Sequence, residues 1–108
     1  MFGNIFVVNV KSFRGNCVYI GRRCGEYSGS VLGNKFKIGV DGDRGEVIEK
    51  YKVWVWGEYK KGGVVKSEID RLVNLVRGGK DVYLGCWCYP KDCHGDVLKK
   101  LIVYLLNK

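Results

Sequence analysis

The densest group of chemically reactive residues in this 108-residue chain lies in residues 85–96. Three of the five cysteines, the only histidine and the only proline fall within these twelve residues. Thiols and an imidazole can bind a metal ion, attack an electrophile or line a ligand site. The side chains that could do this chemistry are Cys86, Cys88, Cys93 and His94.

An anion site is the first chemistry that this stretch predicts. It joins an apolar strand, expected over residues 81–86, to an apolar helix that begins near Gly95 and Asp96. Free N–H groups at a helix N-terminus attract phosphate, and a glycine there lets a ligand approach the backbone closely. Asp96 is also a preferred capping residue, so we expect it to cap the helix. Trp87 would either stack on a base or pack against the protein.

Two further chemistries stay open. The four thiol and imidazole groups suit zinc by type, but the adjacent pair Cys93-His94 is poorly placed to reach one tetrahedral ion. We therefore expect no bound metal or other cofactor and keep zinc as the alternative, with Cys86, Cys88, Cys93 and His94 as its ligands. A thiolate near the imidazole or the helix N-terminus would be a nucleophile, with Cys88, Cys93 and His94 as the catalytic candidates.

Hydrophobic periodicity predicts the elements that position this stretch. Strands are expected over residues 4–10, 17–20 and 81–86, and helices over 44–60, from about 67 to 77, and from about 95 to 106. Asp43 with Glu46, and Ser67 with Asp70, have the spacing of a helix capping box. We predict a single α/β domain over residues 1–108, with a central, mainly parallel sheet of 3–5 strands flanked by three helices.

The net charge of +8 is concentrated in the first part of the chain. Residues 1–40 contain six lysines and arginines but one acidic residue, Glu26. This favours an anionic partner such as nucleic acid, a nucleotide or an acidic protein, although basic proteins that bind nothing charged are also common. Trp54 and Trp56 should point to different faces of their helix, so we expect at least one to be exposed and covered by a homodimer contact.

Composition also predicts where the protein acts. No apolar run approaches the roughly 20 residues that span a bilayer, and residues 1–10 lack the pattern of a signal peptide. We therefore expect a cytoplasmic protein with no membrane partner. In that compartment the five cysteines should be reduced, metal-bound or reactive rather than a disulfide framework, although internal disulfides do occur in hyperthermophiles.

Four ordered motifs resemble domain-of-unknown-function family 4326. They lie at residues 18–22, 32–39, 41–51 and 85–98, and the similarity extends over most of the chain from Val7 onward. That family occurs in phages, prophages, archaeal viruses and cellular genomes, and it has no established activity. Val31 and Lys35 stand where the family has proline, and Gly45 where it has an acidic residue. These departures affect loop rigidity and local charge more than the Cys-His motif.

The resemblance implies one shared pocket. Its expected ligand-binding residues are Arg22, Gly33, Asn34, Asp41, Cys86, Trp87, Cys88, Cys93, His94, Gly95 and Asp96. A basic side chain, an amide and a helix N-terminus together suit a nucleotide or another phosphate-bearing ligand. The alternatives are a small enzyme that acts on a nucleotide or nucleic acid through Cys or His, and a basic nucleic-acid-binding accessory protein. If the protein is viral, its compartment is the host cytoplasm.

Overall fold

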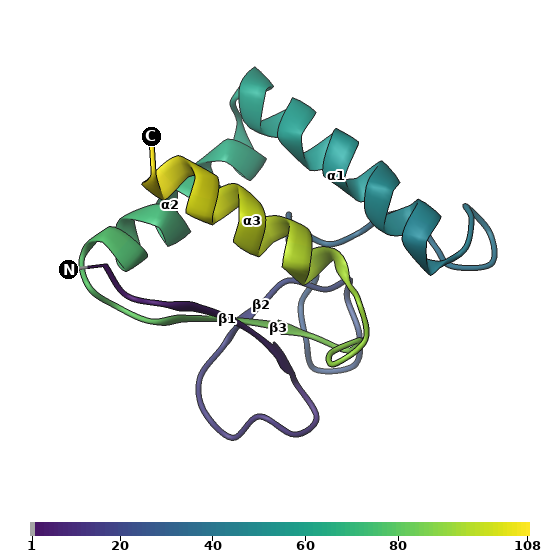
Figure 1. The fold of residues 1–108 in the computed structure, drawn as a ribbon. Helices are drawn as coiled ribbons and strands as arrows, with labels where there is room; N and C mark the ends of the chain where they lie inside the picture. Colours follow the sequence, from purple (N-terminus) through teal and green to yellow (C-terminus); the bar gives the residue numbers. More distant parts are fainter. Residues whose placement is uncertain (1) are drawn as a thin grey trace.

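Three parallel strands form the sheet of this protein. The computed structural model describes residues 2–108 and is shown in Figure 1. The strands are β1 (Ile5–Asn9), β2 (Val18–Tyr19) and β3 (Val82–Cys86), in the order β1-β3-β2. Leu84 of the central strand pairs with Val7 on one side and with Val18 on the other. All three strands therefore end at the same edge of the sheet, where the reactive stretch begins.

Three helices lie on one side of this sheet (Figure 1). They are α1 (Arg44–Lys61), α2 (Val64–Arg77) and α3 (His94–Leu106). Helices α2 and α3 contact the strands, and α1 packs on α2 and α3. The apolar stripes meet in one core, which includes Val7, Ile20, Leu72, Val76, Leu84, Leu101 and Leu105. The predicted α/β class, the parallel sheet and the three helices are confirmed.

The start of α2 differs from the prediction. The helix begins at Val64 after Gly63, three residues before Ser67, and the amide of Ser67 already donates to the Gly63 carbonyl. The carboxylate of Asp70 instead accepts hydrogen bonds from Tyr59 (2.7 Å) and Lys66. The predicted capping box at Ser67 is wrong because this carboxylate ties α2 to the end of α1.

The start of α3 differs by a smaller shift. Cys93 is the N-cap residue of α3, and Asp96 is the third residue of the helix. The carboxylate of Asp96 accepts a hydrogen bond from the Cys93 amide at 3.2 Å, while the Cys93 sulfur accepts one from the Gly95 amide at 3.3 Å. Asp96 thus takes part in the cap, but the capping position itself belongs to a thiol.

The segment between β1 and β2 crosses the face of the sheet that the helices leave open (Figure 1). Phe13 stacks on Tyr83 of β3, with 4.9 Å between the ring centroids. Gly85 has no side chain on this face, and an added Cβ would lie 2.7 Å from the Cys17 sulfur. The missing side chain leaves room for the crossing, which lets two parallel strands follow each other without a helix between them.

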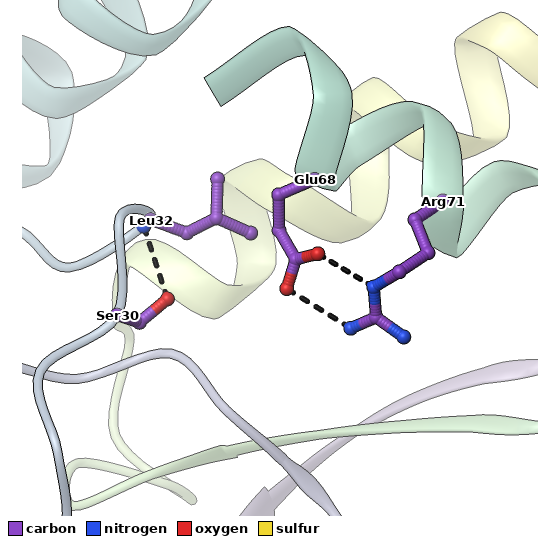
Figure 2. A network of polar contacts seen from close by, with 4 residues as sticks. All are labelled: Ser30, Leu32, Glu68 and Arg71. Carbon is purple, nitrogen blue, oxygen red and sulfur yellow. Dashed lines mark hydrogen bonds and ion pairs between the residues drawn. The ribbon is translucent and has the colours of Figure 1, made fainter. Parts of the chain in front are cut away.

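The loop between β2 and α1 is anchored by Leu32. This side chain is fully buried, and its carbonyl accepts a 2.6 Å hydrogen bond from the buried Tyr51 hydroxyl of α1. Ser30 holds the turn before it, because its hydroxyl oxygen accepts the Leu32 amide at 3.0 Å (Figure 2). The loop is therefore fixed against the helices, and its two ends are brought to the strand edge.

The expectation that Trp54 or Trp56 of α1 is exposed is wrong. Trp56 packs on Tyr104 of α3 at 5.2 Å between centroids, and Trp54 packs on Tyr51 at 5.7 Å. Both are half-buried within the chain, so neither requires a dimer contact to cover it. Trp87 is the tryptophan that reaches the surface, with 38% of its area exposed. Among helices of the described residues, none is long and apolar enough to cross a membrane.

Candidate functional site

A cavity of about 750 Å³ lies at the edge where the parallel strands end. It is lined by residues from four segments, 19–24, 34–40, 44–48 and 86–94. Ligand sites in open α/β sheets lie at this carboxyl edge, and pockets for small molecules measure roughly 300–1,000 Å³. The volume and the place in the fold are therefore those of a small-molecule site.

The cavity brings together most of the residues that the sequence predicted for one site. Seven of them line it, from three separate segments of the chain, namely Arg22, Asn34, Cys86, Trp87, Cys88, Cys93 and His94. The four others, Gly33, Asp41, Gly95 and Asp96, lie outside the lining. The convergence that the family resemblance implied is thus present for the basic, amide, thiol and aromatic groups.

Two of the outlying residues shape the loop beside the cavity. A Cβ on Gly33 would lie 3.1 Å from the carbonyl oxygen of Gly21, so glycine permits close packing of two backbone segments. The Asp41 carboxylate accepts a 2.8 Å hydrogen bond from the Lys37 amide and closes a turn. Gly33 and Asp41 therefore have structural roles in this loop, the first in backbone packing and the second in a turn.

The N-terminus of α3 is occupied by its own side chains. The Cys93 amide donates to the Asp96 carboxylate, and the Gly95 amide donates to the Cys93 sulfur. Gly95 itself is buried against β1, where an added Cβ would lie 2.9 Å from Cγ1 of Val7. These contacts occupy two of the amides that could otherwise attract phosphate, and the Asp96 carboxylate adds an unfavourable charge.

Cationic side chains surround the cavity instead. Four of them line it, against one carboxylate, Asp92; they are Arg22, Arg23, Lys37 and Arg44. The Arg44 guanidinium donates to the Asp92 carbonyl at 2.9 Å and so joins the start of α1 to the loop before α3. Arg23, Lys37 and Arg44 were missed at the sequence level. No local sequence signal marks Arg44, because its place beside the cavity depends on the path of the 87–92 segment.

An aromatic wall closes another side of the cavity. The Trp87 indole N–H donates to the Tyr19 hydroxyl at 2.9 Å, and this hydroxyl in turn donates to the Arg22 carbonyl. Tyr27 packs edge-on against Trp87 at 5.6 Å between centroids. The side chain of Asn9, at the end of β1, donates to the carbonyls of residues 87 and 89 at 3.2 and 2.8 Å. The wall is held in place from all three strands.

His94 joins β2 to α3. Its Nε2 lies 2.7 Å from the Ile20 carbonyl oxygen, which can only accept, so this nitrogen carries the proton. Burial lowers the pKa of His94, and the charge of Arg22 lowers it further, against the raising effect of the Ile20 hydrogen bond. Within residues 2–108 no hydrogen bond joins His94 to a thiol, so the geometry gives no support to a catalytic Cys–His pair.

Two thiols meet at the floor of the cavity. The sulfurs of Cys86 and Cys93 lie 3.2 Å apart, and both residues are buried. The hydrogen bond from Cys93 lowers the pKa of Cys86 to about 6, helped by the amides of Tyr89 and Cys88 and opposed by burial. The same hydrogen bond, together with burial, raises the pKa of Cys93. Cys88 is half-buried nearby.

The thiols and the imidazole do not converge as a metal site. Among residues 2–108 there is no group of three or more His, Cys, Asp or Glu side chains that could hold a metal ion. His94 directs Nε2 to a backbone carbonyl, and Cys86 faces Cys93. The zinc alternative therefore has no set of converging ligands in the part of the chain that the structure describes.

A second cavity of about 530 Å³ lies between α2 and the loop that carries Ser30. Its arginine, Arg71, is held by Glu68 through two hydrogen bonds of 2.6 and 2.9 Å, as Figure 2 shows. The carboxylate neutralises the guanidinium and occupies its donors. The first cavity is therefore the better site for an anionic ligand.

Sequence comparison agrees with the four motifs. The profile of a family described as a domain of unknown function, DUF4326, matches residues 2–104. The chain belongs to DUF4326. The match includes every segment that lines the first cavity.

A relative of this DUF4326 chain is an uncharacterised 12.4 kDa protein from the nrdA-td intergenic region of Enterobacteria phage T4. The two are 31% identical over 77 residues, which cover 70% of this chain and 63% of the phage protein. The chain thus matches less than two thirds of the length of this relative. No solved structure matches the chain.

Proposed function

We propose that this protein binds a nucleotide or a closely related phosphate-bearing small molecule in the first cavity. The single observation that carries the proposal is the composition of the cavity, which is lined by four cationic side chains and by an aromatic wall. Phosphates and bases are recognised by these two kinds of group, respectively.

The phosphate end would lie on the arginines. Arg22 and Arg23 follow β2 and are exposed, while Arg44 is half-buried and fixed by the Asp92 carbonyl. Arginine offers paired N–H donors that match two phosphate oxygens at once. Because the Cys93 and Gly95 amides are already engaged and Asp96 places a carboxylate there, the phosphate contacts in this proposal come from side chains rather than from a helix N-terminus.

The base would lie on the aromatic and apolar side of the cavity. Trp87 and Tyr19 form one wall, and Phe36, Val47 and Ile48 supply further apolar lining. Stacking a base on an aromatic ring contributes about 1–3 kcal/mol, and it tolerates different bases because each has a π-face. Asn34 is the amide in the lining that can read the edge of the base.

Isothermal titration calorimetry against AMP, ADP and ATP tests this proposal, with adenosine and inorganic phosphate as the separate parts. We expect ATP to bind and Arg22→Ala to weaken it by about tenfold or more, because a hydrogen bond to a charged group contributes about 1.5–3 kcal/mol.

Arg14→Ala is the matched control. It removes the same charge from an exposed residue of the β1–β2 segment, outside both cavities. Equal losses for Arg14→Ala and Arg22→Ala would show that net charge and not the cavity drives association. The proposal would also fail if no phosphate-bearing member of the panel bound.

Nucleic acid is the second candidate partner, and the charge of +8 favours it. Lys11 and Arg14 are exposed on the β1–β2 segment, whose Phe13 stacks on Tyr83 on the open face of the sheet. An exposed ring such as Phe6 on a basic protein suits single-stranded nucleic acid, and the net charge alone suits duplex DNA. We propose the cytoplasm as the compartment of this activity, and the cytoplasm of a host cell if the protein is viral like its phage relative.

A further inference from the structure

The pair of thiols at the cavity floor lines the proposed nucleotide site, but none of the nucleotide contacts proposed above uses it. Cys86 ends the central strand and Cys93 caps α3, so two regular elements hold the two sulfurs. Their separation of 3.2 Å is about 1.2 Å more than the roughly 2.05 Å of a disulfide bond. No other pair of cysteines among residues 2–108 is joined by a hydrogen bond between the sulfurs.

We propose that Cys86 and Cys93 form a redox site at which hydrogen peroxide converts the two thiols to an intramolecular disulfide. The segment of residues 87–92 between them would then be closed into a covalent loop. This inference goes beyond nucleotide binding and does not depend on it, because it rests on the contact between the two sulfurs.

The step balances with peroxide as the two-electron oxidant. The sulfur of Cys86, as a thiolate, attacks one peroxide oxygen and the O–O bond breaks, which gives a sulfenic acid and releases water after proton uptake. The sulfur of Cys93 then attacks the Cys86 sulfur, the S–O bond breaks and a second water leaves. In total, two thiols and one peroxide give one disulfide and two waters.

The surroundings favour this order of attack. The contact with Cys93 and the amides of Cys88 and Tyr89 lower the pKa of the Cys86 thiol, whereas the same contact and burial raise the pKa of Cys93. The Cys93 sulfur accepts the Gly95 amide at 3.3 Å, which holds it beside its partner. Cys86 is therefore the attacking thiol and Cys93 the resolving one.

Burial selects a small oxidant. Cys86 is 1% exposed and Cys93 is 2% exposed, although both line the cavity. A molecule of the size of peroxide can reach a sulfur through the cavity, whereas a bulky disulfide must approach along its own S–S bond. Since access governs thiol–disulfide exchange, we expect glutathione disulfide to form the bond at least about tenfold more slowly than peroxide at equal concentration.

Peptide mapping of the intact, reduced chain tests the proposal. The native chain is treated with one equivalent of peroxide, its remaining thiols are alkylated after unfolding, and it is digested with trypsin. Cleavage after Lys80, Lys91 and Lys99 places Cys86 with Cys88 in residues 81–91 and Cys93 in residues 92–99. We expect these two peptides to become joined by a bond that a reducing agent breaks.

Cys88→Ser is the matched control, because it removes the half-buried thiol from the same peptide as Cys86. The joined peptides should persist in this variant and disappear in Cys93→Ser. Recovery of Cys86 and Cys93 in alkylated form from the peroxide-treated native chain would overturn the proposal, as would a cross-link that needs Cys88. The mapping of the unsubstituted chain decides the question even if Cys93→Ser does not fold.

Discussion

At the residue scale, one buried ring has a larger structural role than its chemistry suggests. His94 was a candidate catalyst and metal ligand, yet its Nε2 is bound to the Ile20 carbonyl and its ring packs edge-on against Tyr51 at 5.0 Å. A neutral imidazole makes these contacts without the cost of burying a charge. The ring therefore fixes the strand end that carries Arg22 against the start of α3.

The pH dependence of stability should report this burial. The pKa of His94 is lowered in the folded chain below its ordinary value of 6.5, so the unfolded chain takes up the proton first as the pH falls. The free energy of unfolding should thus decrease as the pH drops through 6.5, measured by urea denaturation at a series of pH values between about 5 and 8.

His94→Gln is the control for this experiment, because glutamine keeps an N–H donor for the Ile20 carbonyl but does not titrate. The slope below about pH 6 should disappear in this variant. Cys86, whose pKa falls from 9.0 to about 6, adds a slope of the same sign between those values, and the variant should retain it. An unchanged slope below pH 6 would assign the effect to other groups.

At the scale of elements, two helical glycines differ in the space around them, so that close packing determines the effect of a substitution at one and helix propensity at the other. Gly95 lies in the first turn of α3 against β1, where an added Cβ would meet Cγ1 of the stiff side chain of Val7 at 2.9 Å. Gly57 lies in α1, and an added Cβ there would have no atom within 4 Å. The same substitution should therefore have opposite effects in the two helices.

Gly95→Ala should lower the free energy of unfolding by about 1–2 kcal/mol, since overpacking forces side chains or backbone to shift. Gly57→Ala should raise it by about 0.5–1 kcal/mol, because alanine is the better helix residue. Urea denaturation of the two variants measures both values. Stabilisation by Gly95→Ala would contradict the close contact between α3 and β1.

The elements could be predicted from sequence where one periodic pattern determined them. The stripe that includes Leu101 and Leu105, and the apolar runs of the strands, needed only burial on one face. The start of α2 could not be predicted, because Asp70 has the spacing of a capping residue but bonds to Tyr59 across a helix boundary. The Cys93 cap was also missed, since thiols are rare in that position.

At the scale of the whole molecule, the cavity was predicted in part. The family resemblance predicted that Arg22 and Asn34 lie near the thiols of residues 85–96, whereas composition alone did not predict this. The roles of Arg44 and Asn9 depend on contacts with backbone carbonyls of the 87–92 segment, whose path is not encoded in any local pattern. The contact of Cys86 with Cys93 depends on that same path.

Net charge is another property of the whole molecule. The salt dependence of binding should distinguish DNA held by this charge from ATP held in the cavity. Duplex DNA held by the net charge of +8 should dissociate steeply as salt rises, because neutralised phosphates release counterions. ATP in the cavity should lose less affinity, since hydrogen bonds and stacking contribute more of it. Fluorescence titration from low to high salt measures both slopes. Equal slopes would favour surface binding for both ligands.

The most direct test of the nucleotide site follows the three indole N–H signals by nitrogen-15 NMR as ATP is added. Trp87 lines the cavity, whereas Trp54 and Trp56 of α1 lie outside its lining and pack on Tyr51 and on Tyr104 of α3, respectively. We predict that the Trp87 indole and the amides of Arg22 and Asn34 shift together and saturate, while the other two indoles stay in place. An ATP titration that leaves the Trp87 indole unmoved would contradict the proposed site.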